Sequence, residues 1–385
     1  MNYSAKLHGW FSGKLSDLIF FQRGFDITQD QQKPGPYPVI SSSGVTSYHN
    51  EFKVKGPGVV IGRKGTIGSI HFTVSDYWPH DTTLWSKDLR ENNPRFVYYF
   101  LQTLDFKRFD VGNSNPTLNR NHIHDLPIKI PPRQIQESII SILSNYDDLI
   151  ENNRRRMALL EESARLLYQE WFVRLRFPGY EHTRIIDGVP EGWKKHRIGD
   201  IADCIGGGTP STKVTAYWED GTITWITPTD VTRNQHIVLL EAERKITEAG
   251  LKNSSAKIIP PHAVLMTSRA SVGFFAITGR DVCTNQGFIS IVPKDTFLSI
   301  FLLLQLKERV EEIRAMGGGS TYIEVSRGKF REFQVLIPPK SLIVDFDEQA
   351  KLSLKQIRVL KQQNQKLRIA RDLLLPRLMS GELAV

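Results

Sequence analysis

Two stretches of the chain carry apolar side chains at an average spacing of 3.5 residues, which is the period of a coiled-coil helix. In the first stretch, residues 138–175, nine of the ten positions on this spacing are apolar and one is an asparagine. In the second stretch, residues 343–375, the spacing is interrupted by Ser353, Asn364 and Arg371. We expect two long helices with the seam positions Ile139, Leu143, Ile150, Asn153, Leu160 and Leu167 in the first, and Ile357, Leu360, Leu367 and Leu374 in the second.

Both apolar stripes are narrow, which favours packing of one helix against the other over two separate amphipathic helices on their own domains. A polar seam residue such as Asn153 typically fixes the register at a cost in stability. The first helix would be ~57 Å long at ~1.5 Å per residue, so an antiparallel pair would hold two domains at opposite ends as rigidly spaced heads. Proline cannot continue a helical ladder, so we expect Pro376 to end the second helix.

The remaining parts of the chain, residues 10–130 and 193–337, have a different pattern. They are rich in Gly, Pro, Thr, Val and aromatic residues, and short alternating runs such as 58–62 and 222–226 are broken by turn signals. Such runs indicate two compact, mainly β domains. Together with the two helices they predict an α+β protein.

The chain repeats itself once. The segment Ile130-Pro131-Pro132 recurs as Ile337-Pro338-Pro339, and residues 61–64 with Gly68 align with residues 265–269 with Gly273. Residues 16–18 likewise pair with residues 199–201, and the order of these features is the same in both halves. We therefore expect two similar domains, each followed by one helix, with a pseudo-two-fold relation within a single chain.

Composition narrows the classes of function. The formal net charge is +9, which fits a nucleic-acid partner without proving one. Two cysteines without a Cys-x-x-Cys pair argue against a zinc ribbon or a disulfide scaffold. The residues after Met1 form no apolar leader, and the longest apolar stretch, near 297–304, is shorter than the ~20 residues of a membrane helix. We expect a cytoplasmic protein without a membrane partner.

Motifs for catalysis are absent from the sequence. The Pro-Pro pairs follow isoleucine rather than the Asn or Asp of an amino-methylating loop, and neither a dinucleotide-binding glycine motif nor a phosphate-binding P-loop is present. The histidines show no convincing ligand spacing. We therefore expect no catalytic residue, no metal site and no cofactor in this chain.

One nuclease-like pattern remains. Asp230, Glu243 and Lys245 could present two carboxylates and a lysine to a metal, but such loose patterns are common and the first half has no counterpart, so a solvated charged stretch is the favoured explanation. A stand-alone nuclease and a coiled-coil transcriptional regulator with two different heads are therefore the alternatives to a non-catalytic DNA-reading scaffold.

Several segments in a fixed order resemble the DNA-specificity subunit of type I restriction–modification enzymes. They are Val189-Pro190-Glu191-Gly192-Trp193-Lys194, then residues 198–201 and 206–211, residues 59–68 in the first half, and the two Ile-Pro-Pro junctions with the helices that follow them. The Gly-Gly-Gly-Thr-Pro-Ser segment at 206–211 occurs only in the second half, whereas the first half has residues 34–44 instead. The two domains thus look like different subtypes, and contacts should not be copied from one to the other.

The resemblance implies target-recognition domains at 1–131 and 193–338, a spacer helix at 132–176, a linker at 177–192, and a second helix with a tail at 339–385. It implies that the chain does no chemistry but reads a bipartite DNA target, with the helices setting the distance between its parts. It also implies partners, namely two modification subunits that use S-adenosylmethionine and motor-nuclease subunits that use ATP and magnesium, in a bacterial or archaeal cytoplasm.

Candidate DNA contacts lie on polar loops and basic turns of the two domains. Arginine binds guanine in a bidentate way, lysine suits phosphate and asparagine pairs with adenine edges, although basic and Asn-rich turns are also common without DNA. The candidates of the first half are Arg63, Lys64, Thr66, Asn113, Ser114, Asn115, Asn119 and Arg120. Those of the second half are Thr209, Ser211, Lys213, Ser268, Arg269, Ser320, Thr321, Tyr322 and Lys329.

Overall fold

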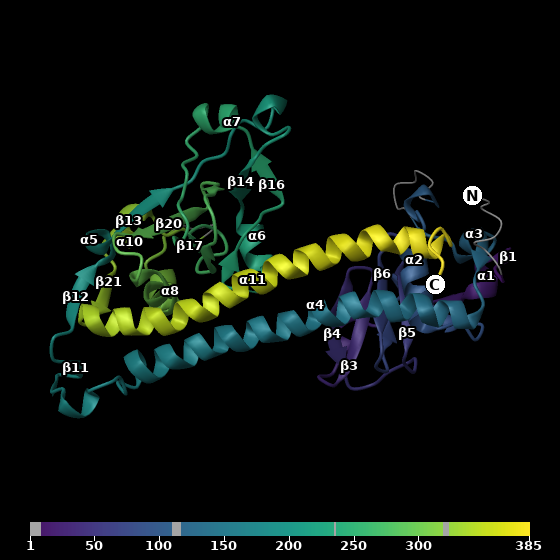
Figure 1. The fold of residues 1–385 in the computed structure, drawn as a ribbon, viewed down its shortest axis with the longest axis horizontal. Coiled ribbons are helices and arrows are strands. Elements are labelled where there is room, and N and C mark those ends of the chain that lie inside the picture. The colour runs from purple at the N-terminus through teal and green to yellow at the C-terminus, as the bar shows by residue number, and fades with distance from the viewer. Residues whose placement is uncertain (1–8, 110–116, 235, 319–322) are drawn as a thin grey trace. The chain divides into compact units, whose positions relative to one another are not determined.

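The computed structural model describes residues 9–109, 117–234, 236–318 and 323–385 (Figure 1). The chain forms two compact units: unit 1 comprises Met1–Ile150 and Gln365–Val385, and unit 2 comprises Glu151–Asn364. The division falls within both long helices, so each unit contains a domain rich in strands together with a segment of each helix. The expected α+β fold with two domains is confirmed.

The domain of unit 1 has a four-stranded sheet of order β2-β8-β5-β6, a three-stranded sheet of order β4-β3-β7 and a small β1-β9 ladder. Its strands are β1 (Phe11–Lys14), β2 (Phe20–Arg23), β3 (Tyr37–Ser41), β4 (Gly44–His49), β5 (Gly58–Gly62), β6 (Ile70–Thr73), β7 (Trp78–Pro79), β8 (Thr83–Asp88) and β9 (Pro127–Ile130). Its helices are α1 (Leu15–Leu18), α2 (Pro94–Gln102), α3 (Arg120–His124) and the 3-10 turns η2 (Gln29–Gln31) and η3 (Lys107–Phe109).

The domain of unit 2 has a five-stranded sheet of order β13-β20-β17-β18-β15, a three-stranded sheet of order β16-β14-β19 and a β12-β21 ladder. Its strands are β12 (Lys194–Arg197), β13 (Ala202–Gly206), β14 (Ile223–Ile226), β15 (Val238–Leu239), β16 (Arg244–Ile246), β17 (Val264–Thr267), β18 (Phe275–Thr278), β19 (Cys283–Thr284), β20 (Phe288–Pro293) and β21 (Gln334–Ile337). Its helices are α5 (Ile198–Ile201), α6 (Pro228–Arg233), α7 (Glu248–Lys252), α8 (Leu298–Glu308), α9 (Val310–Ala315), α10 (Arg327–Arg331) and the 3-10 turn η6 (Thr215–Tyr217). The hairpin β10 (Ile185–Ile186) and β11 (Val189–Pro190) with η5 (Tyr180–His182) precedes it.

The internal repeat extends to individual backbone hydrogen bonds. The N–H of Gly68 donates to the carbonyl of Gly62 at 2.9 Å, and the N–H of Gly273 donates to that of Thr267 at the same distance. The ladders β1-β9 and β12-β21 are both antiparallel, and the pairings β3-β7 and β14-β19 are both parallel. Both domains therefore share one fold, and equivalent positions can be assigned between them.

The long helices are α4 (Arg133–Tyr168), which continues into the π-helical turn η4 (Gln169–Val173), and α11 (Lys340–Met379). Within unit 2 the amide of Asn153 donates to that of Asn364 at 2.9 Å, whereas the rings of Tyr168 and Trp171 both lie 6.2 Å from Phe346. Residues that come later in α4 thus meet residues that come earlier in α11, which confirms the antiparallel pairing.

Within unit 1 the same two helices join the core of the domain. Ile139 and Leu143 of α4 share a buried cluster with Leu375 and Leu378 of α11 and with the apolar face of α2. An ion pair between Asp147 and Arg371 borders this cluster, and the hydroxyl of Tyr99 on α2 donates to Asp147. The arginine that interrupts the apolar spacing therefore pairs with an acid of the other helix.

The expectation that Pro376 ends the second helix is wrong, because α11 continues through it to Met379. Proline removes one donor from the ladder, so the carbonyl of Asp372 has no N–H four residues later. Both residues are exposed, which lets water satisfy that carbonyl. The N–H of Ser380 still donates to the carbonyl of Pro376 at 3.0 Å, so helical bonding resumes after the proline. In the part of the chain that the structure describes, no helix has the length and apolar character needed to span a bilayer.

Candidate nucleic-acid interface

Four loops of unit 1 are joined into one surface by backbone hydrogen bonds. They are residues 24–28 after β2, the turn 63–69 between β5 and β6, residues 80–82 between β7 and β8, and residues 117–119 before α3. The N–H of Phe25 donates to the carbonyl of Pro79 at 2.8 Å, that of Arg63 to Thr82 at 2.8 Å, and that of Leu118 to Arg63 at 2.9 Å. We call these four loops the loop cluster of unit 1; residues 80–82 lie at its centre.

Unit 2 has the same loop cluster, built from residues 207–213, 268–274, 285–287 and 323–326. The N–H of Gly208 donates to the carbonyl of Thr284 at 2.9 Å and that of Ser268 to Gly287 at 2.8 Å. The N–H of Val325 donates to the carbonyl of Ser268 at 2.9 Å. The two loop clusters therefore share the same backbone hydrogen bonds, whereas their side chains differ.

Two equivalent glycines allow the first loop of each cluster to approach the central loop. A Cβ on Gly24 would lie 2.1 Å from the carbonyl oxygen of His80, and one on Gly207 would lie 2.1 Å from that of Asn285. No other residue type tolerates such a distance without moving the backbone. The central loop is thus held in place at both of its ends.

In unit 1 the cluster carries charged side chains. The guanidinium of Arg23 donates to Asp81 at 3.0 Å, and His80 Nδ1 lies 3.1 Å from the same carboxylate. Burial lowers the pKa of the Arg63 guanidinium, the nearby charge of Arg23 lowers it further, and Asp81 opposes the change. Arg63 Nη1 is buried and has no hydrogen-bond partner within the described residues. An acceptor bound here, such as a base edge or a phosphate oxygen, would satisfy this donor.

Asp26, His80 and Asp81 are the residues of unit 1 that could hold a metal, since their ligand atoms lie within 4.8 Å of one another. Arg23 already pairs with Asp81, and its positive charge opposes a cation. The equivalent positions of unit 2, by the offsets of the repeat, are Thr209, Asn285 and Gln286 and include no acid. The chemistry of this trio therefore fits a polar binding surface better than a metal site.

In unit 2 the cluster carries neutral polar side chains. The hydroxyl of Thr209 donates to the side-chain oxygen of Gln286 at 2.5 Å, and both residues are exposed. The Asn285 side chain accepts from the N–H of Gly287 at 2.9 Å and so stabilises its own turn. The Trp218 indole N–H donates to the carbonyl of Ser211 at 3.0 Å. This bond fixes the loop that continues from Thr209.

The candidates from the sequence lie around these clusters with different accessibility. Thr66, Asn119, Arg120, Thr209, Ser211, Lys213, Arg269 and Lys329 are exposed, and Arg63 and Lys64 are half-buried. Ser268 is buried, so only its backbone serves the turn. Arg269 lies 3.7 Å from Glu324, and the Asn119 side chain caps α3 by accepting from Asn121. Asn113, Ser114, Asn115, Ser320, Thr321 and Tyr322 lie outside the described residues.

The central loops, 80–82 and 285–287, were missed by reasoning from the sequence. Neither has a basic turn or a run of asparagines. The repeat itself carried the missing signal, because an offset of 205 residues aligns His80-Asp81-Thr82 with Asn285-Gln286-Gly287. The equivalent loop positions of the two domains carry different polar residues. This difference indicates that the two loop clusters bind different chemical groups.

The nuclease-like pattern is structural. The Asp230 carboxylate accepts from the N–H and hydroxyl of Thr227 at 2.8 and 2.6 Å and from the N–H of Glu243 at 3.0 Å. This arrangement is a capping box at the start of α6. The Glu243 carboxylate faces solvent 3.9 Å from Arg233, and Lys245 lies on β16 opposite Thr224. The hypothesis of a metal-binding pair of carboxylates is therefore wrong.

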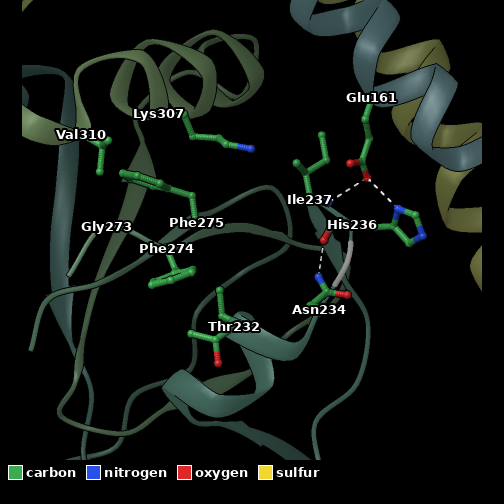
Figure 2. Close-up of a pocket in the computed structure, with 11 residues that line it drawn as sticks. Glu161, Thr232, Asn234, His236, Ile237, Gly273, Phe274, Phe275, Lys307 and Val310 are labelled. Carbon is green, nitrogen blue, oxygen red and sulfur yellow. Dashed lines mark hydrogen bonds and ion pairs between the residues drawn. The ribbon is translucent and has the colours of Figure 1, made fainter. Parts of the chain in front are cut away.

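The domain of unit 2 is attached to both long helices through Asn234 and residues 236–238. Figure 2 shows Glu161 of α4 accepting from the N–H of Ile237 at 2.8 Å and lying 3.3 Å from His236 Nδ1. Lys361 of α11 donates to the side-chain oxygen of Asn234 at 2.6 Å. A cavity of about 340 Å³ beside Glu161 is lined by polar and aromatic side chains, including Thr232 and Phe275. The hydrogen bonds of Glu161 and Lys361 hold the β15 edge of the five-stranded sheet on the two helices.

The fold is a duplicated domain in which each copy carries a polar loop cluster and joins segments of two antiparallel helices. Residues 8–162 and 190–367 match the type I restriction modification DNA specificity domain, and the chain belongs to this family. The resemblance seen in the sequence is thereby confirmed.

Named relatives agree with this assignment. The type I restriction enzyme MjaIX specificity subunit of Methanocaldococcus jannaschii is 39% identical over 155 residues, which are 40% of this chain and 36% of the relative. The HindI specificity subunit of Haemophilus influenzae is 23% identical over 358 residues, covering 75% of this chain and 77% of the relative. The crystal structure of a type I S subunit from M. genitalium has a TM-score of 0.58 at 14% identity and covers 96% of both chains. It supports the fold.

Proposed function

We propose that this chain is the DNA-reading subunit of a type I restriction–modification complex and that each unit reads one part of a split DNA target. The observation that carries the proposal is the duplicated loop cluster with unlike side chains. The central loop carries Asp81, paired with Arg23, in unit 1, but carries Gln286, bonded to Thr209, in unit 2. Arginine, glutamine and threonine are side chains that read base edges, and the net charge of +9 favours approach to the phosphate backbone.

The helix pair supports a role as spacer. α4 and α11 contain 36 and 40 residues, and at ~1.5 Å per residue each is longer than one turn of DNA, which is about 34–36 Å. Helices of this length could set a fixed distance between two DNA segments. Such a spacer suits a target whose two parts are separated by bases that are not read. The two parts should differ, because the two loop clusters differ, so the target should be asymmetric.

The partners in this proposal bind a second apolar stripe on the outside of the helices. Leu159, Leu166 and Val173 follow one another at a seven-residue spacing and are 44–69% exposed. Leu352, Val359 and Leu373 of α11 fall on the same heptad position and are 45–66% exposed. Apolar residues repeated at this spacing are typical of a surface covered by another helix. Since the internal repeat relates Leu166 to Leu373, two copies of one partner could bind, as two modification subunits would.

The chain itself performs no chemistry in this proposal and needs no cofactor. S-adenosylmethionine would be bound by the modification subunits, and ATP and magnesium by the motor-nuclease subunits. The complex would act in the cytoplasm, where its double-stranded DNA substrate lies. The chain would position the methylating subunits over adenines within the two halves of the target.

The experiment is methylome sequencing of a host without adenine methylation that expresses this chain together with its modification subunit. We expect one new motif with two unlike halves, separated by a fixed number of unread bases and methylated at adenine in both. The chain expressed alone serves as the control and should add no methylation. A palindromic motif, or methylation by the chain alone, would contradict the proposal.

A further inference from the structure

We propose that Arg23 in unit 1 and Gln286 in unit 2 read bases directly, and that each is oriented for this by the residue to which it is hydrogen-bonded. This inference deepens the proposed function and rests on it. Arg23 would read guanine and Gln286 would read adenine. Asp81 and Thr209 would be the positioning residues.

The proposed readers lie at the central loop of each cluster. Asp81 and Gln286 occupy equivalent positions of the two central loops, and each central loop is bonded to the loops on both of its sides. Arg23 ends β2, directly before the glycine that approaches the central loop most closely. The side chains at this point therefore project from a rigid backbone, which is what reading a base edge requires.

In unit 1 the bond to Asp81 orients the Arg23 side chain. Arg23 keeps about half of its side chain exposed (53%), whereas that of Asp81 is largely buried (18%). The bond of 3.0 Å between Arg23 Nη2 and Asp81 Oδ2 leaves the other guanidinium N–H groups free to bond outward. Two parallel donors match the O6 and N7 acceptors of guanine in the major groove. Asp81 is too buried to be the reader and instead reduces the freedom of the arginine.

In unit 2 the bond from Thr209 orients the Gln286 side chain. The hydroxyl of Thr209 donates to Oε1 of Gln286, so the amide oxygen faces Thr209 and the Nε2 group faces away from it. The oxygen retains one lone pair and the Nε2 group retains its donors. One donor and one acceptor side by side match N7 and the N6 amino group of adenine.

The turns between β5 and β6 and between β17 and β18 are less suited to this role. Arg63 is half-buried against Arg23 and Asp81, and Arg269 is held 3.7 Å from Glu324. Ser268 is buried. We therefore assign these turns to support and phosphate contact and the Arg23 and Gln286 side chains to sequence reading.

The experiment measures base discrimination of the complex with its modification subunit. DNA duplexes carry the methylated motif of the wild-type complex and every single base substitution in it. Arg23→Lys keeps the charge but loses the bidentate fork, and Gln286→Ala removes the amide. Each should lose on the order of 10- to 100-fold discrimination at one position, a guanine in one half for Arg23 and an adenine in the other half for Gln286. Both residues are exposed, so folding should be unaffected.

The positioning residues have a separate test. Thr209→Val removes only the hydroxyl and should weaken discrimination at the adenine read by Gln286, while Thr209→Ser should restore it. Asp81→Asn should act at the guanine read by Arg23. Matched controls are Arg133→Ala, an exposed ion-paired arginine outside the cluster, and Gln334→Ala, an exposed glutamine on β21. Both should leave every position unchanged.

The outcomes separate this inference from the proposed function. If the wild-type complex reads a split motif but the Arg23 and Gln286 variants keep its full discrimination, the inference fails and the proposed function stands. The same holds if these variants weaken binding evenly on all sequences, because that result indicates phosphate contact. If the wild-type complex recognises no split motif, the proposed function fails first.

Discussion

Two asparagines lie inside the apolar seam of the helix pair and bond to each other. Asn153 and Asn364 are 6% and 3% exposed and come from segments 211 residues apart. Since an unpaired buried amide costs more than a paired one gains, the pair penalises every alignment of the helices that separates them. The sequence alone indicates that a polar seam residue such as Asn153 fixes the register, but it does not show that Asn364 is its partner.

We expect Asn364→Leu to lower the free energy of unfolding by about 1–3 kcal/mol, because it leaves the Asn153 amide buried without its partner. The double variant with Asn153→Leu should regain most of this loss, and chemical denaturation measures both values. Asn152→Leu, at an exposed position of α4 next to Asn153, is the control. Simple additivity of the two single changes would show that the amides are not coupled.

The glycines of the loop clusters permit a second prediction. Gly207→Ala would place a Cβ 2.1 Å from the carbonyl oxygen of Asn285, and overpacking of this kind costs about 1–3 kcal/mol. The change should also displace residues 285–287, so discrimination in one half of the target should fall while the other half is unaffected. Base-substituted duplexes and a thermal melt provide the two measurements.

The control for that prediction is Gly328→Ala in α10. No atom lies within 4 Å of a Cβ at this glycine, and alanine favours the helix. Stability should therefore stay equal or rise slightly. Equal effects of the two substitutions would mean that the close approach at Gly207 has no structural importance.

At the scale of elements, periodicity predicted the helices well and their termini poorly. The 3.5-residue spacing predicted both helices and their pairing, because a narrow apolar stripe needs one partner. It could not predict that α11 passes through Pro376, since the cost of proline depends on whether water reaches the carbonyl four residues earlier. It also could not pair Arg371 with Asp147, because that pair depends on the register of two distant segments.

The loop clusters were only partly predictable for a similar reason. A basic turn such as residues 63–65 is visible as a local motif, whereas residues 80–82 gain their importance from three loops that meet around them. Long-range hydrogen bonds, such as that from Arg63 to Thr82, create the cluster, and no local pattern encodes them. Comparison of the two halves, position by position, was the route by which the sequence could have revealed it.

The spacer hypothesis predicts the effect of lengthening one helix. Insertion of four residues after Asn153 adds ~6 Å at ~1.5 Å per residue and shifts the seam out of phase. We expect either a loss of stability or a changed number of unread bases in the methylated motif. A seven-residue insertion, which preserves the phase, should lower stability less. A stable protein with the original motif after the four-residue insertion would exclude the helices as a ruler.

At the scale of the whole molecule, the proposed function implies that duplication gives one chain two independent specificities. Exchange of residues 10–130 for the corresponding domain of another family member should therefore change one half of the methylated motif and leave the other half and the spacing intact. Distant sites contribute additively when no contact is shared, which is the reason for this expectation. Changes in both halves of the motif would show that the two domains do not act independently.

The outer apolar stripe predicts how the complex assembles. Leu159→Lys combined with Leu166→Lys should abolish co-purification with the modification subunit while the melting temperature stays nearly constant, because both side chains are exposed. Ile185→Lys, at a similarly exposed apolar residue outside the helices, is the control. Undiminished co-purification of the double variant would place the partner elsewhere.

Unit 1 is built from two segments that lie far apart in the sequence, and this has a consequence for biosynthesis. Its core needs residues 365–385, but residues 151–364 leave the ribosome first. At about 5–20 residues per second this delay lasts on the order of ten seconds or more, far longer than most domains need to fold. During that interval the face of Ile139 and Leu143 lacks Leu375 and Leu378. Nascent chains should therefore pass through a stage at which chaperone binding, or a codon-dependent pause near residue 364, decides how much protein reaches the native state.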